Sequence, residues 1–156
     1  MVPHTATSTS TDTRRLKAAQ AARHSVLIVD PDAESVESLS LDLLEAGYEV
    51  VSCADAVEFL LHLGRRSYDL VLLEVDLPDI DGCLLVDILA QKWVDSEILL
   101  MTSLPPRVMT AHFPRCHPEE CLRKPISREE LMARVGKALH VADREVRDRN
   151  LRRPSA

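Results

Sequence analysis

Residues 69–82 read "DLVLLEVDLPDIDG", an apolar run that ends on Glu74 and passes into a loop holding Asp76, Asp79 and Asp81. A short, continuous run of Leu and Val bounded by turn residues is typical of a strand buried on both faces. A buried carboxylate is costly unless it has a partner. The acidic end of this strand is therefore the first place to look for a functional site.

The rest of the chain repeats the same alternation of strand and helix. Four more short apolar runs lie at 26–29, 48–53, 97–101 and 120–123. Helical spacing between them predicts three apolar helix faces, formed by Val36, Leu39, Leu43 and Leu44, by Val57, Leu60 and Leu61, and by Leu84, Leu85, Ile88 and Leu89. This βαβ pattern predicts an α/β protein with a doubly wound, five-stranded parallel sheet of the flavodoxin-like type.

Composition limits the function classes. A chain of 156 residues with 46% hydrophobic content can bury one core, so we expect one domain. The net charge of −6 argues against a broad nucleic-acid-binding face. No apolar run approaches the ~20 residues that span a bilayer, and the amino terminus lacks a secretory signal, so we expect a cytoplasmic protein. Reduced thiols are expected at the four cysteines, which are Cys53, Cys83, Cys116 and Cys121.

The chain divides into three parts. Residues 1–24 are rich in Ser, Thr and Ala and are predicted to be a disordered arm, residues 25–139 form the folded domain, and residues 140–156 form a helical extension with an Arg-rich tail. The last helix is expected to start at Ser127, because Glu130 follows three residues later as in a capping box. Its apolar spacing leaves two alternatives, a heptad-like seam that continues past the domain or a second half that frays.

The strand ends carry polar side chains that could act together. By pattern, the first strand ends at Asp30, the third at Glu74, the fourth at Thr102 and the fifth at Lys124. Ligands of open parallel sheets bind at the carboxyl ends of strands, and this set could hold a divalent metal and a phosphoryl group together. Each residue alone also has a simpler interpretation, as a helix cap, a turn former or a solvated loop cation.

The sequence resembles the receiver domain of bacterial two-component response regulators. The match runs from Ser25 to Leu139 and rests on "VLIVDPD", "DLVLLEVDLPDIDG", "LLMTS" and "LRKPIS". The resemblance implies that Asp30 is a magnesium-binding acid, that Glu74 stands where the phosphoacceptor Asp would be, and that Asp76 supplies a metal-binding carbonyl. Equivalents of the residues that contact the phosphoryl group are Thr102 and Lys124.

Two departures from the family pattern concern this site. Pro31 stands where the family has a second metal-binding acid, so binding of magnesium by Asp30, Glu74 and Asp76 is expected to be weak or absent. Asp32 could reach in from the next position, although capping of the following helix is the favoured role for it. Glu74 is one methylene longer than Asp, which moves its carboxylate out by roughly 1.5 Å and should prevent in-line attack on a phosphoryl donor.

The displaced Glu74 carboxylate leaves two hypotheses open. It could contact Lys124 and Thr102 and so imitate the phosphorylated state. Alternatively, it fills a decayed site and pairs with Lys124 only to avoid an unpaired buried charge.

A third departure lies at the switch position, where the family usually has Tyr or Phe and this chain has Cys121. The preceding helix is limited to about two turns near Arg107 to Phe113 by surrounding prolines. The close spacing of His112, Cys116, His117 and Cys121 also allows a soft-metal site, but a buried cysteine with solvated histidines is the favoured interpretation.

Together these features predict a non-enzymatic, single-domain receiver of two-component (phosphorelay) signalling that works without phosphorylation, through a protein partner. The partner would be a histidine kinase or a downstream signalling protein, and neither nucleic acid nor membrane is expected to bind. Homodimer formation is left open. The alternatives are a conventional magnesium-dependent phosphoacceptor and a structural oligomerisation module that uses the last helix.

Overall fold

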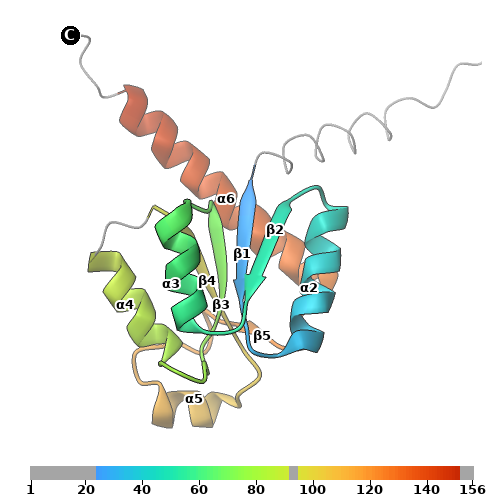
Figure 1. The fold of residues 1–156 in the computed structure, drawn as a ribbon, viewed down its shortest axis with the longest axis vertical. Helices are drawn as coiled ribbons and strands as arrows, with labels where there is room; N and C mark the ends of the chain where they lie inside the picture. Colours follow the sequence, from blue (N-terminus) through green and yellow to red (C-terminus); the bar gives the residue numbers. More distant parts are fainter. Residues whose placement is uncertain (1–23, 92–94, 152–156) are drawn as a thin grey trace, which may run out of the picture.

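The computed structural model describes residues 24–91 and 95–151, with side chains through His140. Strands and helices alternate along this part of the chain (Figure 1). The elements are β1 (Ser25–Val29), α2 (Ala33–Glu45), β2 (Glu49–Cys53), α3 (Ala56–Arg65), β3 (Leu70–Glu74), α4 (Gly82–Gln91), β4 (Glu97–Thr102), α5 (Pro106–His112), β5 (Leu122–Arg123) and α6 (Arg128–Leu151). The predicted order of elements is confirmed.

The five strands form one parallel sheet in the order β2-β1-β3-β4-β5. The chain therefore first winds outward from β1 to β2, then returns past β1 to β3 and continues the other way. The direction of winding reverses at β1 and β3, and such a reversal leaves a crevice at the carboxyl ends of these two strands. The strands that border this crevice end next to Asp30 and at Glu74. The predicted doubly wound, flavodoxin-like sheet is confirmed.

Helices cover both faces of the sheet (Figure 1). On one face α2 and α6 pack through Leu39, Leu43, Leu131 and Val135 against alternate residues of the strands. On the other face α3 and α4 contribute Phe59, Leu85 and Leu89 to a second core. Because both faces are covered, β1 and β3 are buried along their whole length, which explains their unbroken apolar sequences.

The predicted apolar face of α3 is wrong. Ala56 and Phe59 face the sheet and are 5% and 0% exposed, because Phe59 is the largest apolar side chain of this helix and fixes its rotation. Val57, Leu60 and Leu61 are exposed instead. The other two predicted faces hold except at one residue each, since Leu44 and Leu84 are also exposed.

α5 is a short helix between prolines, as the sequence predicts. It spans seven residues and lies at the end of the sheet toward which the strands point (Figure 1). Its buried residue Met109 packs with Val75, Cys83, Cys116 and Cys121 in a third, smaller core. The strand that follows, β5, is two residues long and shorter than predicted.

α6 begins as predicted, with the Glu130 N–H donating to Ser127 Oγ at 3.2 Å. It packs on the sheet as far as Leu139 and continues to Leu151, past the sheet (Figure 1). The predicted arm (1–24) lies, except for His24, outside the described residues, as do residues 152–156 of the predicted tail. None of the helices in the described part of the chain is long and apolar enough to cross a membrane.

Candidate functional site

Three charged side chains meet at the carboxyl ends of β1, β3 and β5. Lys124 Nζ lies 2.5 Å from Asp30 Oδ2 and 2.6 Å from Glu74 Oε2. Both contacts are close ion pairs. Asp30 and Glu74 are 2% and 4% exposed. One ammonium therefore bridges two buried carboxylates that the sequence places 44 positions apart.

The local backbone holds the second oxygen of each carboxylate. The Asp32 N–H donates to Asp30 Oδ1 at 2.9 Å, and the Asp76 N–H donates to Glu74 Oε1 at 3.1 Å. In both cases the donor lies two residues after the acid, and the Asp30 contact is an Asx turn. Each carboxylate thus uses one oxygen for the backbone and the other for Lys124, so the cluster is fixed from two sides.

The pKa values at the site reflect a balance of burial and charge. Burial raises the pKa of Glu74 above its usual range, and contact with Lys124 and the Asp76 N–H offsets only part of this effect. Burial alone would lower the pKa of Lys124, but contact with Asp30 and Glu74 outweighs it and raises the pKa. Lys124 is therefore a firmly protonated cation between two acids.

Thr102 takes part in the site differently from what the sequence suggests. Its side chain is fully buried, and its Oγ1 accepts a hydrogen bond from the Leu104 N–H at 3.0 Å. The Lys124 N–H donates to the Thr102 carbonyl oxygen at 2.9 Å, so the backbones of the two residues are joined. Among the contacts of the described residues, Glu74 reaches Lys124 but not the Thr102 hydroxyl.

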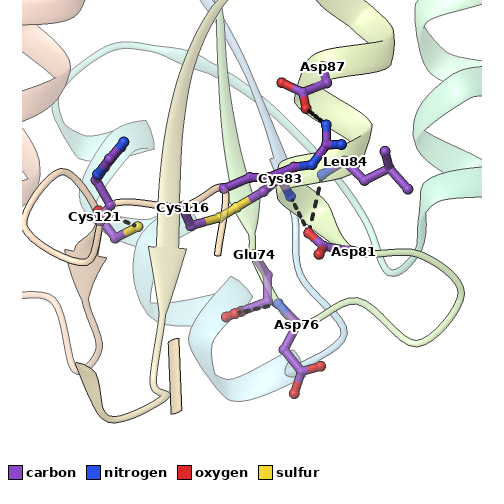
Figure 2. The surroundings of a disulfide bond; sticks show 10 residues. Glu74, Asp76, Asp81, Cys83, Leu84, Asp87, Cys116 and Cys121 are labelled. Atoms are coloured by element: carbon purple, nitrogen blue, oxygen red, sulfur yellow. Dashed lines mark hydrogen bonds and ion pairs between the residues drawn. A yellow bond between two sulfur atoms is a disulfide. The ribbon is translucent and has the colours of Figure 1, made fainter. Parts of the chain in front are cut away.

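The residues at the metal position do not suit magnesium well. Pro31 is exposed and has no carboxylate. Asp32 caps α2 by accepting from the Glu34 N–H at 3.1 Å, which is the favoured role from sequence. The Asp76 carboxylate is exposed and turns away from that of Glu74 (Figure 2). A magnesium ion held by Asp30, Glu74 and the Asp76 backbone carbonyl would have to compete with the Lys124 ammonium for both acids.

The site remains open on the α2 side. A pocket of about 340 Å³ adjoins Lys124. Its lining includes Asp32, Ser35, Ser38, Ser103 and Ile126. The lining combines polar side chains with the apolar Leu39, Pro125 and Ile126, and the pocket gives solvent a route to the neighbourhood of Lys124.

The loop after Glu74 is closed by residues that sequence reasoning did not single out for this role. Gly82 N–H donates to the Val75 carbonyl oxygen at 2.9 Å, and a Cβ on Gly82 would lie 2.5 Å from the Glu74 carbonyl oxygen. Asp81 Oδ1 accepts from the Cys83 N–H at 2.7 Å and so caps α4. The capping role of Asp81 was predictable from the sequence, because an Asp directly before a helix is a common cap.

Asp79 links the same loop to α3. Its two carboxylate oxygens accept from the Ala56 N–H at 3.1 Å and the Val57 N–H at 3.2 Å. A carboxylate at a helix N-terminus is stabilising because it satisfies free N–H groups and opposes the helix dipole. No local sequence signal predicts this contact, since the partners are separated by more than 20 residues.

The expectation of four reduced cysteines is wrong. Cys83, at the start of α4, and Cys116, after α5, form a disulfide with their Cα atoms 5.9 Å apart (Figure 2). Cys53 and Cys121 are free and buried. The sequence does not predict the Cys83–Cys116 bond, because the two cysteines are 33 residues apart and belong to different elements.

The hypothesis of a soft-metal site at His112, Cys116, His117 and Cys121 finds no support in this geometry. Cys116 is bonded to Cys83, and Cys121 Sγ donates to the His117 carbonyl oxygen at 3.5 Å. Burial raises the pKa of the Cys121 thiol. Cys121 is therefore a neutral, buried thiol.

The geometry matches a known family. The model of the response regulator receiver domain matches residues 26–136, which is most of the chain. The chain therefore belongs to the response regulator receiver domain family, the signalling modules of two-component systems.

Curated relatives support the same assignment. Over 111 residues the chain is 35% identical to the probable transcriptional regulatory protein SilR of Salmonella typhimurium and 32% identical to the transcriptional activator protein PfeR of Pseudomonas aeruginosa. These matches cover 70% of this chain but 48% and 36% of the two relatives. The chain thus corresponds to half or less of the length of these regulators.

Solved structures agree with the fold. A putative response regulator from Chloroflexus aurantiacus superposes with a TM-score of 0.65 at 33% identity, covering 75% of this chain and 98% of that one. A CheY-like receiver domain protein from Methanospirillum hungatei gives a TM-score of 0.67 at 23% identity, covering 78% of this chain and 98% of that one. The second likeness shows the fold alone.

Proposed function

We propose that this chain is an atypical receiver that signals by binding a protein partner and does not require phosphorylation. The observation that carries the proposal is the buried contact between Glu74 and Lys124. In this arrangement the residue at the phosphoacceptor position is already paired with the cation that would otherwise contact a phosphoryl group.

Glu74 is poorly placed to act as a nucleophile. One of its oxygens accepts from the Asp76 N–H and the other contacts Lys124. Attack on a phosphoryl donor would require one oxygen to leave its partner and to lie in line with the leaving group. The cation that should stabilise the transferred group is itself neutralised by Asp30 and Glu74. Both requirements for phosphoryl transfer are therefore opposed by the resting geometry.

The same contact would hold the domain in one signalling conformation. The ionised Glu74 carboxylate provides Lys124 with a negative charge that needs no phosphorylation. A charge-assisted contact of this kind holds β5 against β3 without a chemical modification. The partner would then recognise a constant surface, and a histidine kinase or a downstream signalling protein fits this role.

A phosphotransfer assay tests the proposal. The wild type and a Pro31→Asp/Glu74→Asp double variant are incubated with acetyl phosphate and magnesium, and the products are measured by intact mass spectrometry. We expect no phosphorylated wild type, and a product labile to hydroxylamine in the double variant. A hydroxylamine-labile phosphate on the wild-type chain would return it to the conventional phosphoacceptor class.

A further inference from the structure

The disulfide joins two segments that both lead into the site. Cys83 is the second residue of α4, one residue after the β3–α4 loop (residues 75–81) that follows Glu74. Cys116 lies in the middle of the α5–β5 segment (residues 113–121), which leads through β5 to Lys124. Figure 2 shows the Cys83–Cys116 bond passing from the start of α4 to this segment, above Glu74.

The α5–β5 segment is weakly held by its own backbone. Two hydrogen bonds lie within it, from the Cys116 N–H to the Phe113 carbonyl oxygen and from the Glu120 N–H to the His117 carbonyl oxygen. Pro114 and Pro118 have no N–H to contribute. Segments with few backbone hydrogen bonds open at low free-energy cost. Local opening therefore gives small molecules access to Cys116 although it is 5% exposed.

One other polar contact crosses from this segment to α4 alongside the disulfide. Arg115 forms an ion pair with Asp87, and their side chains are 62% and 46% exposed. An exposed pair of this kind contributes little to stability. The small apolar core around Met109 also joins the two segments. The Arg134 guanidinium, which donates to the Glu120 carbonyl oxygen at 2.6 Å, holds the α5–β5 segment to α6 and not to α4. The covalent bond is thus the strongest link between the two segments.

We propose that Cys83 and Cys116 are a reversible redox pair whose oxidation fixes the α5–β5 segment against the β3–α4 loop beside Glu74. The Cα separation of 5.9 Å suits a disulfide without movement of the backbone. The cysteines belong to separate segments, so reduction frees one segment from the other and leaves the sheet intact. The inference concerns a second input to the chain and does not depend on the absence of phosphorylation.

The oxidant is a low-molecular-weight disulfide such as oxidised glutathione. The Cys116 thiolate attacks one glutathione sulfur, which forms a mixed disulfide and releases the first glutathione thiolate. The Cys83 thiolate then attacks Cys116 Sγ, which closes the intramolecular bond and releases the second glutathione thiolate. The two cysteines lose two electrons, the glutathione disulfide gains them, and the two thiol protons pass to solvent or to the released thiolates.

Asp81 favours the oxidised form. Its carboxylate lies within 4.8 Å of both sulfur atoms. Reduction of a disulfide releases thiolates, and a negative charge at this distance opposes their formation. Asp81→Asn keeps an oxygen that can cap α4 and removes this charge. The variant should therefore be reduced at a lower ratio of reduced to oxidised glutathione than the wild type.

The test compares the two redox states of the full chain. Native protein is equilibrated in mixtures of reduced and oxidised glutathione, quenched in acid, alkylated and digested, and the Cys83–Cys116 link is quantified by mass spectrometry. Amide hydrogen exchange of residues 104–123 is measured in the same samples. We expect one reversible transition and exchange slower by on the order of tenfold in the oxidised state. The free Cys53 serves as an internal reference that stays unlinked.

Cys83→Ser and Cys116→Ser are the matched controls, and both should exchange like the reduced wild type in every buffer. The conclusion does not depend on these variants folding, because the wild type is compared with itself. The proposal is overturned if the thiols stay free in oxidised glutathione, if the bond resists reduction in the native protein, or if exchange is the same in both states. One zinc per chain that protects both thiols from alkylation would also overturn it.

Discussion

Glu74 at the end of β3 pairs directly with a lysine from the end of β5. Its Oε2 lies 2.6 Å from Lys124 Nζ. Asp30 shares the same cation from β1. The position at the end of β3 was predictable from the sequence, as was the contact with Lys124. That the Thr102 hydroxyl would turn to the Leu104 N–H was not predictable, because it depends on the local turn after β4.

Removing Lys124 should be more damaging than removing Glu74. Lys124→Met leaves two buried carboxylates without a cation and should destabilise the fold by about 3 kcal/mol. Glu74→Met leaves Lys124 paired with Asp30 and should cost about 1–2 kcal/mol. The free energies of unfolding in urea measure the difference. Equal losses of unfolding free energy in the two variants would contradict the idea that Lys124 compensates the charge of both carboxylates.

The raised pKa of Glu74 predicts a pH dependence of known sign. A carboxyl whose pKa is higher in the folded state than its ordinary 4.5 binds its proton more tightly when folded. Stability therefore decreases as pH rises from about 4.5 through the folded pKa. Glu74→Gln does not titrate, so the unfolding free energy of the wild type minus that of this variant should fall over this range and then level off. A difference that grows with pH would mean that Lys124 outweighs burial.

At the level of elements, the close approach of α4 to β3 depends on Gly82. A Cβ there would meet the Glu74 carbonyl oxygen at 2.5 Å and the Val75 Cα at 3.0 Å. Both are backbone atoms, so the start of α4 must move away from the site. Gly82→Ala should destabilise the protein by about 2 kcal/mol or more.

Gly136→Ala is the matched control in α6, because nothing lies within 4 Å of the Cβ it would introduce. It should stabilise the protein by about 0.5–1 kcal/mol, since Ala is the better helix former. Thermal unfolding followed by circular dichroism compares the two variants. A Gly82→Ala variant as stable as the wild type would contradict the proposed tight contact between α4 and β3.

Elements also show where sequence patterns fail. Strand identity was predictable because buried parallel strands have unbroken apolar runs, as in β1 and β3. The face of α3 was not, because this helix has apolar residues on more than one side and Phe59 decides which side is buried. The capping of α3 by Asp79 and the Cys83–Cys116 bond were also unpredictable. Both join segments that become neighbours only after the sheet has formed.

At the scale of the whole molecule, the fold brings the ends of β1, β3 and β5 together at one edge of the sheet. The charged side chains of Asp30, Glu74 and Lys124 meet there. The receiver fold is retained from β1 to α6 and matches the family over residues 26–136. The charges at the site depart from the pattern of the family, because Pro31 stands in place of an acid and Glu74 pairs with the Lys124 ammonium. We therefore propose that an intact scaffold holds a site that does not respond to a phosphoryl group.

The most direct measurement of this claim is an amide NMR titration with magnesium and then with beryllofluoride, a mimic of a bound phosphoryl group. The wild type is compared with the Pro31→Asp/Glu74→Asp variant. We expect no shift of the Thr102 and Lys124 amide signals in the wild type, and clear shifts of both in the variant. Shifts at these two residues in the wild type would overturn the proposal, since they would show that the ligand displaces Glu74 from Lys124.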